Sequence, residues 1–169
     1  MELIGFFLFC TIYSWYLSST SPDSKPEIIE NKAMDIVKVV NLNHTELIRY
    51  IDKMLGQEFE SFLQCLLEKL GYIVFQTATS GDFGADLIAY KDGFKIIIQA
   101  KRYSSAVGIK AVQEALGAVN HYNANKAIVI TNNSFTKKAC ELAASNNVEL
   151  WDRSILFELI LFVKRKLKD

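Results

Sequence analysis

Histidine and cysteine are scarce in this sequence. There are 2 histidines and 3 cysteines among 169 residues, with no CxxC or HExxH spacing. This scarcity argues against a zinc site built from Cys and His side chains. Cys10, Cys65 and Cys140 are odd in number and lie in apolar contexts. They are therefore predicted to be reduced, buried thiols rather than a disulfide framework.

The chain also lacks net charge, with 19 Lys and Arg against 19 Asp and Glu. A zero balance argues against a nucleic-acid partner, because such proteins usually carry a basic surface. Along the chain, however, residues 1–100 carry 8 basic and 13 acidic side chains, and residues 101–169 carry 11 and 6. The net charges are −5 and +5, so the average conceals an acidic half and a basic half. Hydrophobic residues make up 50% and charged residues 22%, which excludes a disordered chain.

No charged side chain occurs from Leu3 to Ser21. Residues 3–20 give 18 largely apolar positions, near the lower limit of about 17 residues for a membrane-spanning helix. Tyr13, Trp15 and Tyr16 lie at the C-terminal end, where amphipathic aromatic rings favour the membrane interface. The sequence predicts a transmembrane anchor over residues 1–20. A cleaved signal peptide and a buried helix are the alternatives, although the positive start of a signal peptide is missing.

Basic residues indicate the orientation of this segment. None precedes it, whereas Lys25, Lys32 and Lys38 follow it. The positive-inside rule then predicts a single-pass protein whose C-terminal part lies in the cytoplasm. If the segment is not a true span, we expect a cytoplasmic protein.

Three regions are expected: the anchor, a linker over residues 21–42 and a compact domain over 43–169. Residues 18–26 have the composition of a linker. The capping-box pattern at Ser24 predicts a short amphipathic helix over 25–40. That helix would dock either on the domain or on a membrane surface, and the sequence leaves both open.

Hydrophobic periodicity within the compact domain predicts an α/β sandwich. Apolar residues from Phe59 to Leu70 recur at helical spacing, and Gly71 is placed to end that helix. Strands are expected at 72–79, 85–90 and 94–101, with an Asp92-Gly93 hairpin turn between the last two. Helices over 107–121, 135–146 and 153–168 then alternate with strands over 127–131 and 148–151. The hairpin followed by alternating units predicts a mixed sheet flanked by helices.

Three polar side chains are expected to converge at one edge of this sheet. Gln99 and Lys101 are two residues apart on one strand and therefore project to the same face. Asp86 opens the neighbouring antiparallel strand and should face Gln99 at about 5 Å. A carboxylate and an amide oxygen can bind Mg²⁺ or Mn²⁺, and a lysine can orient water or stabilise charge on phosphorus. This combination suits phosphodiester hydrolysis, and Asp82 in the glycine-rich loop lies nearby.

The motifs around these residues resemble a known family. The pattern GQEFESFLQCLLEKLGYIV, TATSGDFGADLIAYKDG, IIIQAKRY, VGIKAVQEALGA and AIVITNNSFTKKACELA is similar to the Mrr-type restriction endonucleases of the PD-(D/E)xK nuclease superfamily. The resemblance covers about residues 56–157. It implies a restriction endonuclease-like three-layer sandwich, a DNA substrate and a divalent metal. Ala85 replaces the proline that usually precedes the aspartate.

The resemblance also implies site roles. By position, Asp86 corresponds to the metal-binding aspartate, Gln99 to a substituted second ligand and Lys101 to the catalytic lysine. Glu60 in the first helix corresponds to a third metal ligand, and Gln113 to a polar position on the helix that faces the site. Because glutamine carries no charge, we expect weaker metal binding than with glutamate.

Basic residues in the second half are candidates for contacts with DNA phosphates; they are Arg102, Lys110, Lys137 and Lys138. The terminal KRKLK is interpreted instead as a solvated helix end. No separate recognition domain is expected, so specificity would come from the catalytic domain, a homodimer partner or another subunit.

The leading hypothesis is a Mg²⁺-dependent DNA endonuclease that acts on foreign or modified DNA. The alternatives are a nuclease selective for branched DNA, a non-catalytic DNA-binding module on the same fold, and a membrane scaffold that binds protein.

Overall fold

The computed structural model describes residues 36, 38, 39, 41–77 and 83–168. The chain divides into the units Met1–Met34 and Asp35–Asp169, and all described residues belong to the second. The predicted anchor over residues 3–20, most of the predicted linker, and Asp82 lie outside the described residues. None of the helices in the described part combines the length and the apolar character that a membrane crossing requires.

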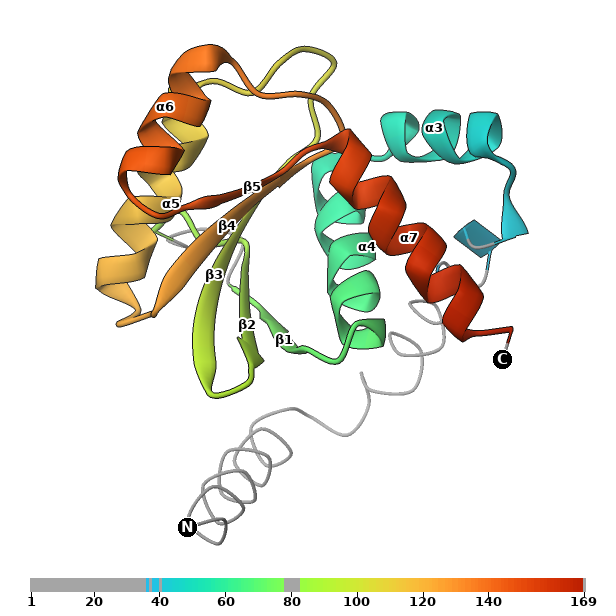
Figure 1. Cartoon of the computed structure of the whole chain (residues 1–169), viewed down its shortest axis with the longest axis horizontal. Coiled ribbons are helices and arrows are strands. Elements are labelled where there is room, and N and C mark those ends of the chain that lie inside the picture. Colours follow the sequence, from blue (N-terminus) through green and yellow to red (C-terminus); the bar gives the residue numbers. More distant parts are fainter. Residues whose placement is uncertain (1–35, 37, 40, 78–82, 169) are drawn as a thin grey trace, which may run out of the picture. The chain divides into compact units, whose positions relative to one another are not determined.

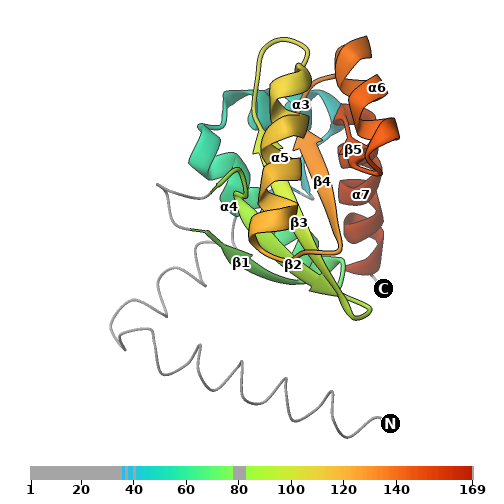
Figure 2. The same cartoon turned by 90° about the vertical axis from the view of Figure 1, so that its left-hand side faces the viewer.

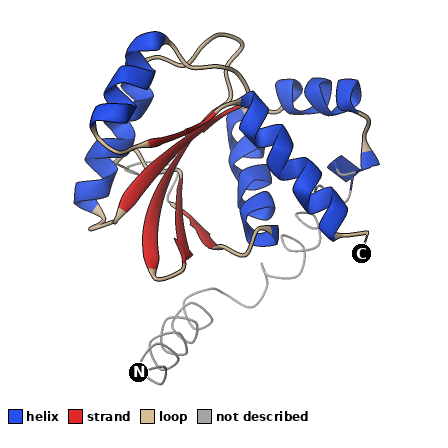
Figure 3. Cartoon of the chain, in the orientation of Figure 1, coloured by secondary structure: helices blue, strands red, loops and turns tan. Residues whose placement is uncertain are grey.

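A five-stranded mixed sheet forms the centre of the described domain (Figure 3). Its strands run in the order β1 (Ile73–Gln76), β2 (Leu87–Lys91), β3 (Phe94–Lys101), β4 (Lys126–Thr131) and β5 (Glu149–Trp151). The first three strands pair antiparallel, and β3, β4 and β5 pair parallel. The mixed sheet expected from the sequence is therefore confirmed.

The β2–β3 hairpin turns where the Asp-Gly pair predicted it. Asp92 and Gly93 both have positive φ, at 51° and 79°, as a two-residue type I′ turn requires. This turn sets the register, in which Leu87 lies opposite Ile98. The residues that precede β2 are consequently brought beside the end of β3.

Helices cover both faces of the sheet, which gives three layers (Figure 1). On one face lie α4 (Gly56–Lys69) and α7 (Arg153–Lys166), and on the other lie α5 (Ile109–His121) and α6 (Lys137–Ser145). Figure 2 shows α5 running across β3 and β4. Alternation along β3 serves both layers, since Ile96 and Ile98 join the core on the α4 side and Ile97 joins the core on the α5 side.

Side-chain caps define where the first helices begin. Asn43 and Glu46 form a capping box at the start of α3 (His44–Lys53). The helical conformation is interrupted between α3 and α4, which begins at Gly56. The Leu55 amide donates to Oε2 of Glu58 at 2.6 Å. Glu58 therefore caps the N-terminus of α4. At the other end of α4, Gly71 has φ +86°, as expected for a residue that ends a helix.

The core extends further toward the N-terminus than residue 43. Ile36 and Val39 are helical, and each is only 1% exposed within the core on the α4 side. The end of the predicted 25–40 helix therefore docks on the domain, because its apolar side chains are buried there.

The cysteine prediction is confirmed only in part. Cys65 is buried and is not in a disulfide, whereas Cys140, also outside any disulfide, is exposed on α6. Ala139 and Ala143 form the buried side of that short helix, which leaves Cys140 on the solvent side. Cys10 lies outside the described residues.

Candidate active site

Asp86 and Gln99 meet at the open end of the β2–β3 hairpin. The Asp86 amide donates to the Ile98 carbonyl at 3.0 Å, which continues the ladder one residue beyond β2. Nε2 of Gln99 and the Ala100 amide, at 2.6 Å, both donate to Oδ2 of Asp86. The juxtaposition that the strand register predicted is therefore present.

The other end of the Gln99 amide has no hydrogen-bond partner in the described structure. Gln99 is 2% exposed, and its Oε1 is buried without a donor. An unsatisfied buried carbonyl costs about 1–3 kcal/mol, so such a group usually has a ligand or a function. An amide oxygen is also a good ligand for a hard divalent cation, and it lies beside a carboxylate here.

Lys101 follows two residues later and projects from the same face of β3. Its Nζ lies 2.9 Å from Oε2 of Glu114 on α5, and its carbonyl accepts a hydrogen bond from the Thr131 hydroxyl at 2.7 Å. Burial lowers the pKa of Lys101, but the hydrogen bond that its ammonium group donates to Glu114 and the negative charges of Glu114 and Asp86 raise it by more. The pKa is therefore above its ordinary value, and the side chain is a cation at neutral pH.

The loop before Asp86 is pressed against α5. Gly84 has φ +88°, and a Cβ at this position would lie only 2.5 Å from the Glu114 carbonyl oxygen. The adjacent Phe83 ring stacks on His121, with ring centroids 3.8 Å apart. Only glycine permits this approach, so the loop reaches Asp86 by a route that α5 defines.

The opposite side of this loop is held by β1. The Thr77 hydroxyl donates to the carbonyls of Ala85 and Asp86, the latter at 3.1 Å, and the Thr77 amide donates to the Asp86 carbonyl at 3.1 Å. The backbone of Asp86 is thus anchored to both neighbouring strands.

Glu60, the predicted third ligand, lies in the first half of α4 and is partly buried. The hydroxyl of its neighbour Ser61 accepts a hydrogen bond from Nε2 of Gln76 at 3.1 Å, and Gln76 pairs with Leu87. Glu60 is therefore at the end of the sheet where Asp86 lies. Its role as a metal ligand stays a prediction.

Gln113 was predicted to face the site, but it is exposed. Glu114 makes the contact with Lys101 instead. The buried face of α5 is formed by Ala111, Val112, Ala115 and Ala118. On a helical wheel of about 100° per residue, Gln113 falls opposite the centre of this face and Glu114 at its flank. A wheel for this helix could have shown from the sequence that Glu114, rather than Gln113, borders the buried face, but not that it meets Lys101.

A polar network next to the site was not expected from the sequence. Oδ1 of Asp52 accepts hydrogen bonds from Nδ2 of Asn132 and Nη2 of Arg153, both at 2.8 Å. Asn132 is buried, and its Oδ1 accepts from the Tyr103 amide at 2.8 Å. Nη1 of Arg102 donates to the Asp52 carbonyl at 3.3 Å. The structure therefore places Arg102 against α3, and a role in DNA binding is not tested.

The three candidate DNA-binding lysines are exposed at the beginnings of two helices. The Lys110 and Lys137 side chains are 87% and 91% exposed, each 3.8 Å from a glutamate one turn later, and Lys138 is exposed. The segments before α5 and α6 pair, since the Val107 amide donates to Ser134 at 2.8 Å and the Thr136 amide to Val107 at 2.9 Å. Two helix N-termini and three lysines therefore lie together, and both features favour anions.

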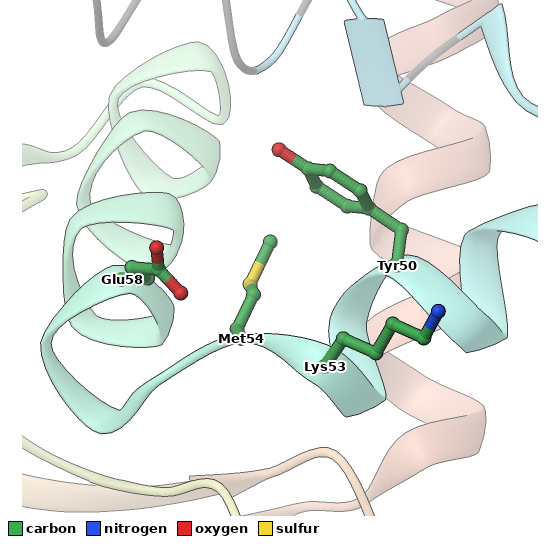
Figure 4. Close-up of a pocket in the computed structure, with 4 residues that line it drawn as sticks. All are labelled: Tyr50, Lys53, Met54 and Glu58. Carbon is green, nitrogen blue, oxygen red and sulfur yellow. The ribbon is translucent and has the colours of Figure 1, made fainter.

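A small surface pocket of about 240 Å³ lies where α3 ends and α4 begins, lined by Tyr50, Lys53, Met54 and Glu58 (Figure 4). Figure 4 shows Met54 pointing up beside Tyr50 and Lys53 extending along the helix away from it. The lining residues include none of Asp86, Gln99 and Lys101. The described residues also contain no group of three or more His, Cys, Asp or Glu side chains placed to hold a metal.

Comparisons with known proteins identify relatives of this chain. The chain is 26% identical over 137 residues to the type IV methyl-directed restriction enzyme EcoKMrr of Escherichia coli (strain K12); the match covers 76% of this chain and 43% of that protein. The chain thus spans less than half of the length of this relative.

Two solved restriction enzymes share the fold at 18% sequence identity. The DNA modification-dependent restriction endonuclease AspBHI matches with a TM-score of 0.53 over 82% of this chain and 36% of its own. The MspJI restriction endonuclease, solved in complex with a 27-mer oligonucleotide, matches with a TM-score of 0.50 over 87% and 33%. The Mrr_cat family model, described as restriction endonuclease, matches residues 51–160. The chain therefore belongs to the Mrr_cat family of restriction endonuclease domains.

Proposed function

We propose that this protein is a divalent-metal-dependent DNA endonuclease of a restriction system, which hydrolyses phosphodiester bonds at Asp86, Gln99 and Lys101. The observation that carries the proposal is the contact between a carboxylate and a buried amide beside an ion-paired lysine, at the end of β3. Membership of the restriction endonuclease family supports it.

The donor set fits a hard divalent cation such as Mg²⁺ or Mn²⁺. The Asp86 carboxylate supplies charge, and the buried Oε1 of Gln99, which has no hydrogen-bond partner, supplies a neutral oxygen. Glu60, from α4 at the same end of the sheet, is the proposed third ligand. When bound, the cation polarises the scissile phosphate and stabilises the charge on the attacking and leaving oxygens.

Lys101 acts as a cation in this proposal. Its raised pKa keeps the ammonium group charged at neutral pH, so it orients the attacking water and neutralises charge that develops on phosphate oxygens. Lys110, Lys137 and Lys138 bind phosphates along the duplex beside the site.

The proposed substrate is modified DNA. EcoKMrr is named as methyl-directed and AspBHI as modification-dependent, and this chain is similar to the first in sequence and to part of the second in fold.

Plasmid cleavage by the full chain tests the proposal. We expect nicked or linear product with Mg²⁺ or Mn²⁺, and a loss of at least about 100-fold in Lys101→Ala and Asp86→Ala. Parallel assays on plain, methylated and branched duplexes identify the substrate. Preference for branched DNA would favour a structure-selective nuclease. DNA binding without cleavage in any metal would establish a non-catalytic module instead.

A further inference from the structure

Glu114 has no role in the site that the sequence predicted, yet it contacts two of its parts. Its Oε2 lies 2.9 Å from Nζ of Lys101, with the two side chains 30% and 20% exposed. Its backbone is the surface against which Gly84 packs, two residues before Asp86. A single residue of α5 therefore borders both the lysine and the loop that carries the aspartate.

The backbone contact limits where Glu114 can be. An added Cβ at Gly84 would lie 2.5 Å from the Glu114 carbonyl oxygen and 2.8 Å from its carbonyl carbon. Glycine at position 84 therefore lets the loop backbone lie directly against the backbone of Glu114. The residue that presents its carboxylate to Lys101 is thus also in backbone contact with the loop that precedes Asp86.

Lys101 needs such a partner, because a lysine side chain has four flexible carbons and about 2 kcal/mol of rotamer entropy. Without an anion the ammonium group would sample several rotamers. The Glu114 carboxylate selects one of them, on the face of β3 that carries Gln99.

The surroundings of Glu114 also argue against a metal-ligand role. One carboxylate oxygen lies 2.9 Å from Lys101, and the other lies 3.8 Å from Nζ of Lys110. A metal cation at this carboxylate would have to compete with two ammonium groups. Among the described residues, Oε1 of Gln99 is instead a buried oxygen without a hydrogen-bond partner.

We propose that Glu114 is a positioning residue of the nuclease site, which holds the Lys101 ammonium group beside the Asp86–Gln99 pair. This inference rests on the proposed endonuclease function. Glu114 contacts neither substrate nor metal, so it acts on turnover only through Lys101.

Steady-state cleavage by the full chain tests the role in turnover. Glu114→Gln should lower kcat by about 10- to 100-fold, as expected for a misplaced catalytic group, and should leave KM for DNA and the half-saturating Mg²⁺ concentration within about twofold. Glu114→Asp, which retracts the charge by one methylene group, should fall between wild type and Glu114→Gln.

Glu141 provides a matched control. It forms the same i,i+4 pair with Lys137, at the same 3.8 Å as Lys110 and Glu114, but it is 63% exposed on α6. Glu141→Gln should retain wild-type kcat. A several-fold rise in half-saturating Mg²⁺ for Glu114→Gln, with kcat restored at high Mg²⁺, would make Glu114 a metal ligand and overturn the proposal. Unchanged kcat would also overturn it.

A second measurement does not depend on activity. Acetylation of lysines by acetic anhydride, followed by mass spectrometry, reports how strongly each amine is held in an ion pair. Lys101 should react several-fold faster in Glu114→Gln than in wild type, whereas Glu141→Gln should change Lys137 and not Lys101.

The two measurements separate the two proposals. A wild-type protein that cleaves no DNA refutes the proposed function, and the labelling still decides whether Glu114 holds Lys101. Equal labelling of Lys101 in wild type and Glu114→Gln refutes the positioning role, even in an active enzyme. Thermal unfolding of each variant confirms that it folds, and Glu114→Asp replaces Glu114→Gln if the latter does not.

Discussion

The two ends of the Gln99 amide have different surroundings. Its amide nitrogen donates to Asp86, while its buried oxygen has no hydrogen-bond partner. A glutamate at this position would add a charged ligand, but it would face Asp86 across the hairpin as a like charge. Glutamine therefore lowers the repulsion in the metal-free protein at the expense of metal affinity.

We predict that Gln99→Glu lowers the half-saturating Mg²⁺ concentration for cleavage by about 3- to 10-fold, because the number of ligand charges tunes affinity. The variant should also unfold at a lower temperature without metal and regain stability when Mg²⁺ is added. A Mg²⁺ titration of plasmid cleavage and of the Tm measures both effects. Gln99→Met, which has a similar volume and no amide oxygen, is the control and should show no stabilisation by metal. An unchanged requirement in Gln99→Glu would contradict the assignment.

Connections between elements hold the end of the sheet together. Asp52 at the end of α3 binds Asn132, which follows β4, and Arg153, which begins α7. The same Asn132 accepts from the Tyr103 amide, two residues after Lys101. Three segments far apart in the sequence are thereby joined next to the end of β3.

We predict that Asp52→Asn destabilises the protein by about 1–2 kcal/mol. Hydrogen bonds to charged groups contribute about 1.5–3 kcal/mol, and the partial exposure of this pair reduces that value. Urea unfolding followed by circular dichroism measures the change. Glu149→Gln, which removes the more exposed pair with Lys126 at 2.7 Å, should cost less than about 1 kcal/mol. Equal losses of unfolding free energy in the two variants would show that the Asp52 network stabilises the protein no more than the Glu149–Lys126 pair does.

The adjacent N-termini of α5 and α6 lead to a prediction about salt. Replacing Lys110, Lys137 and Lys138 with glutamine should weaken DNA binding and reduce the slope of log K against log salt by about 0.9 for each lost phosphate contact. Titrations of a fluorescent duplex at several salt concentrations give this slope. Replacement of Arg165, Lys166 and Lys168 at the end of α7 removes the same charge and should leave the slope nearly unchanged. The reverse result would place the DNA on the α7 tail.

At the scale of the whole described domain, two cores organise the structure, one on each face of the sheet. The larger includes Ile36 and Val39, which precede the sequence-predicted domain start at residue 43. The smaller is built mainly from alanine and valine beneath α5 and α6. These small side chains let α5 approach the sheet closely, and Glu114 is thereby brought to Lys101.

We predict that Ile36→Ala in the full chain lowers the free energy of unfolding by about 2–4 kcal/mol, since it empties a fully buried site. Val39→Ala should act in the same direction with a smaller loss. Leu161→Ala on the exposed side of α7 is the control, expected within about 0.5 kcal/mol of wild type. Denaturant unfolding of the three variants makes the comparison. A loss no larger than that of Leu161→Ala would mean that the domain does begin near residue 43.

Much of the fold, and the contact between Asp86 and Gln99 in the candidate site, followed from local sequence patterns. Alternation, helical spacing and the Asp92-Gly93 turn predicted the order of helices and strands, and the hairpin register alone placed Asp86 opposite Gln99. These inferences succeed because neighbouring residues of one strand or one hairpin have a fixed geometry. The anchor predicted over residues 3–20 lies outside the described residues and stays a prediction.

Only the tertiary structure decided which distant residues meet. Glu114 reaches Lys101 because α5 packs across β3 with Glu114 beside the end of that strand. The close approach of Gly84 to the Glu114 backbone belongs to the same packing. Asp52, Asn132 and Arg153 meet because the end of α3, the end of β4 and the start of α7 lie close together. Such contacts depend on packing between layers, and no spacing along the chain encodes packing. The sequence by itself therefore determined the hairpin and its three polar residues, and the packed layers determined what holds them in place.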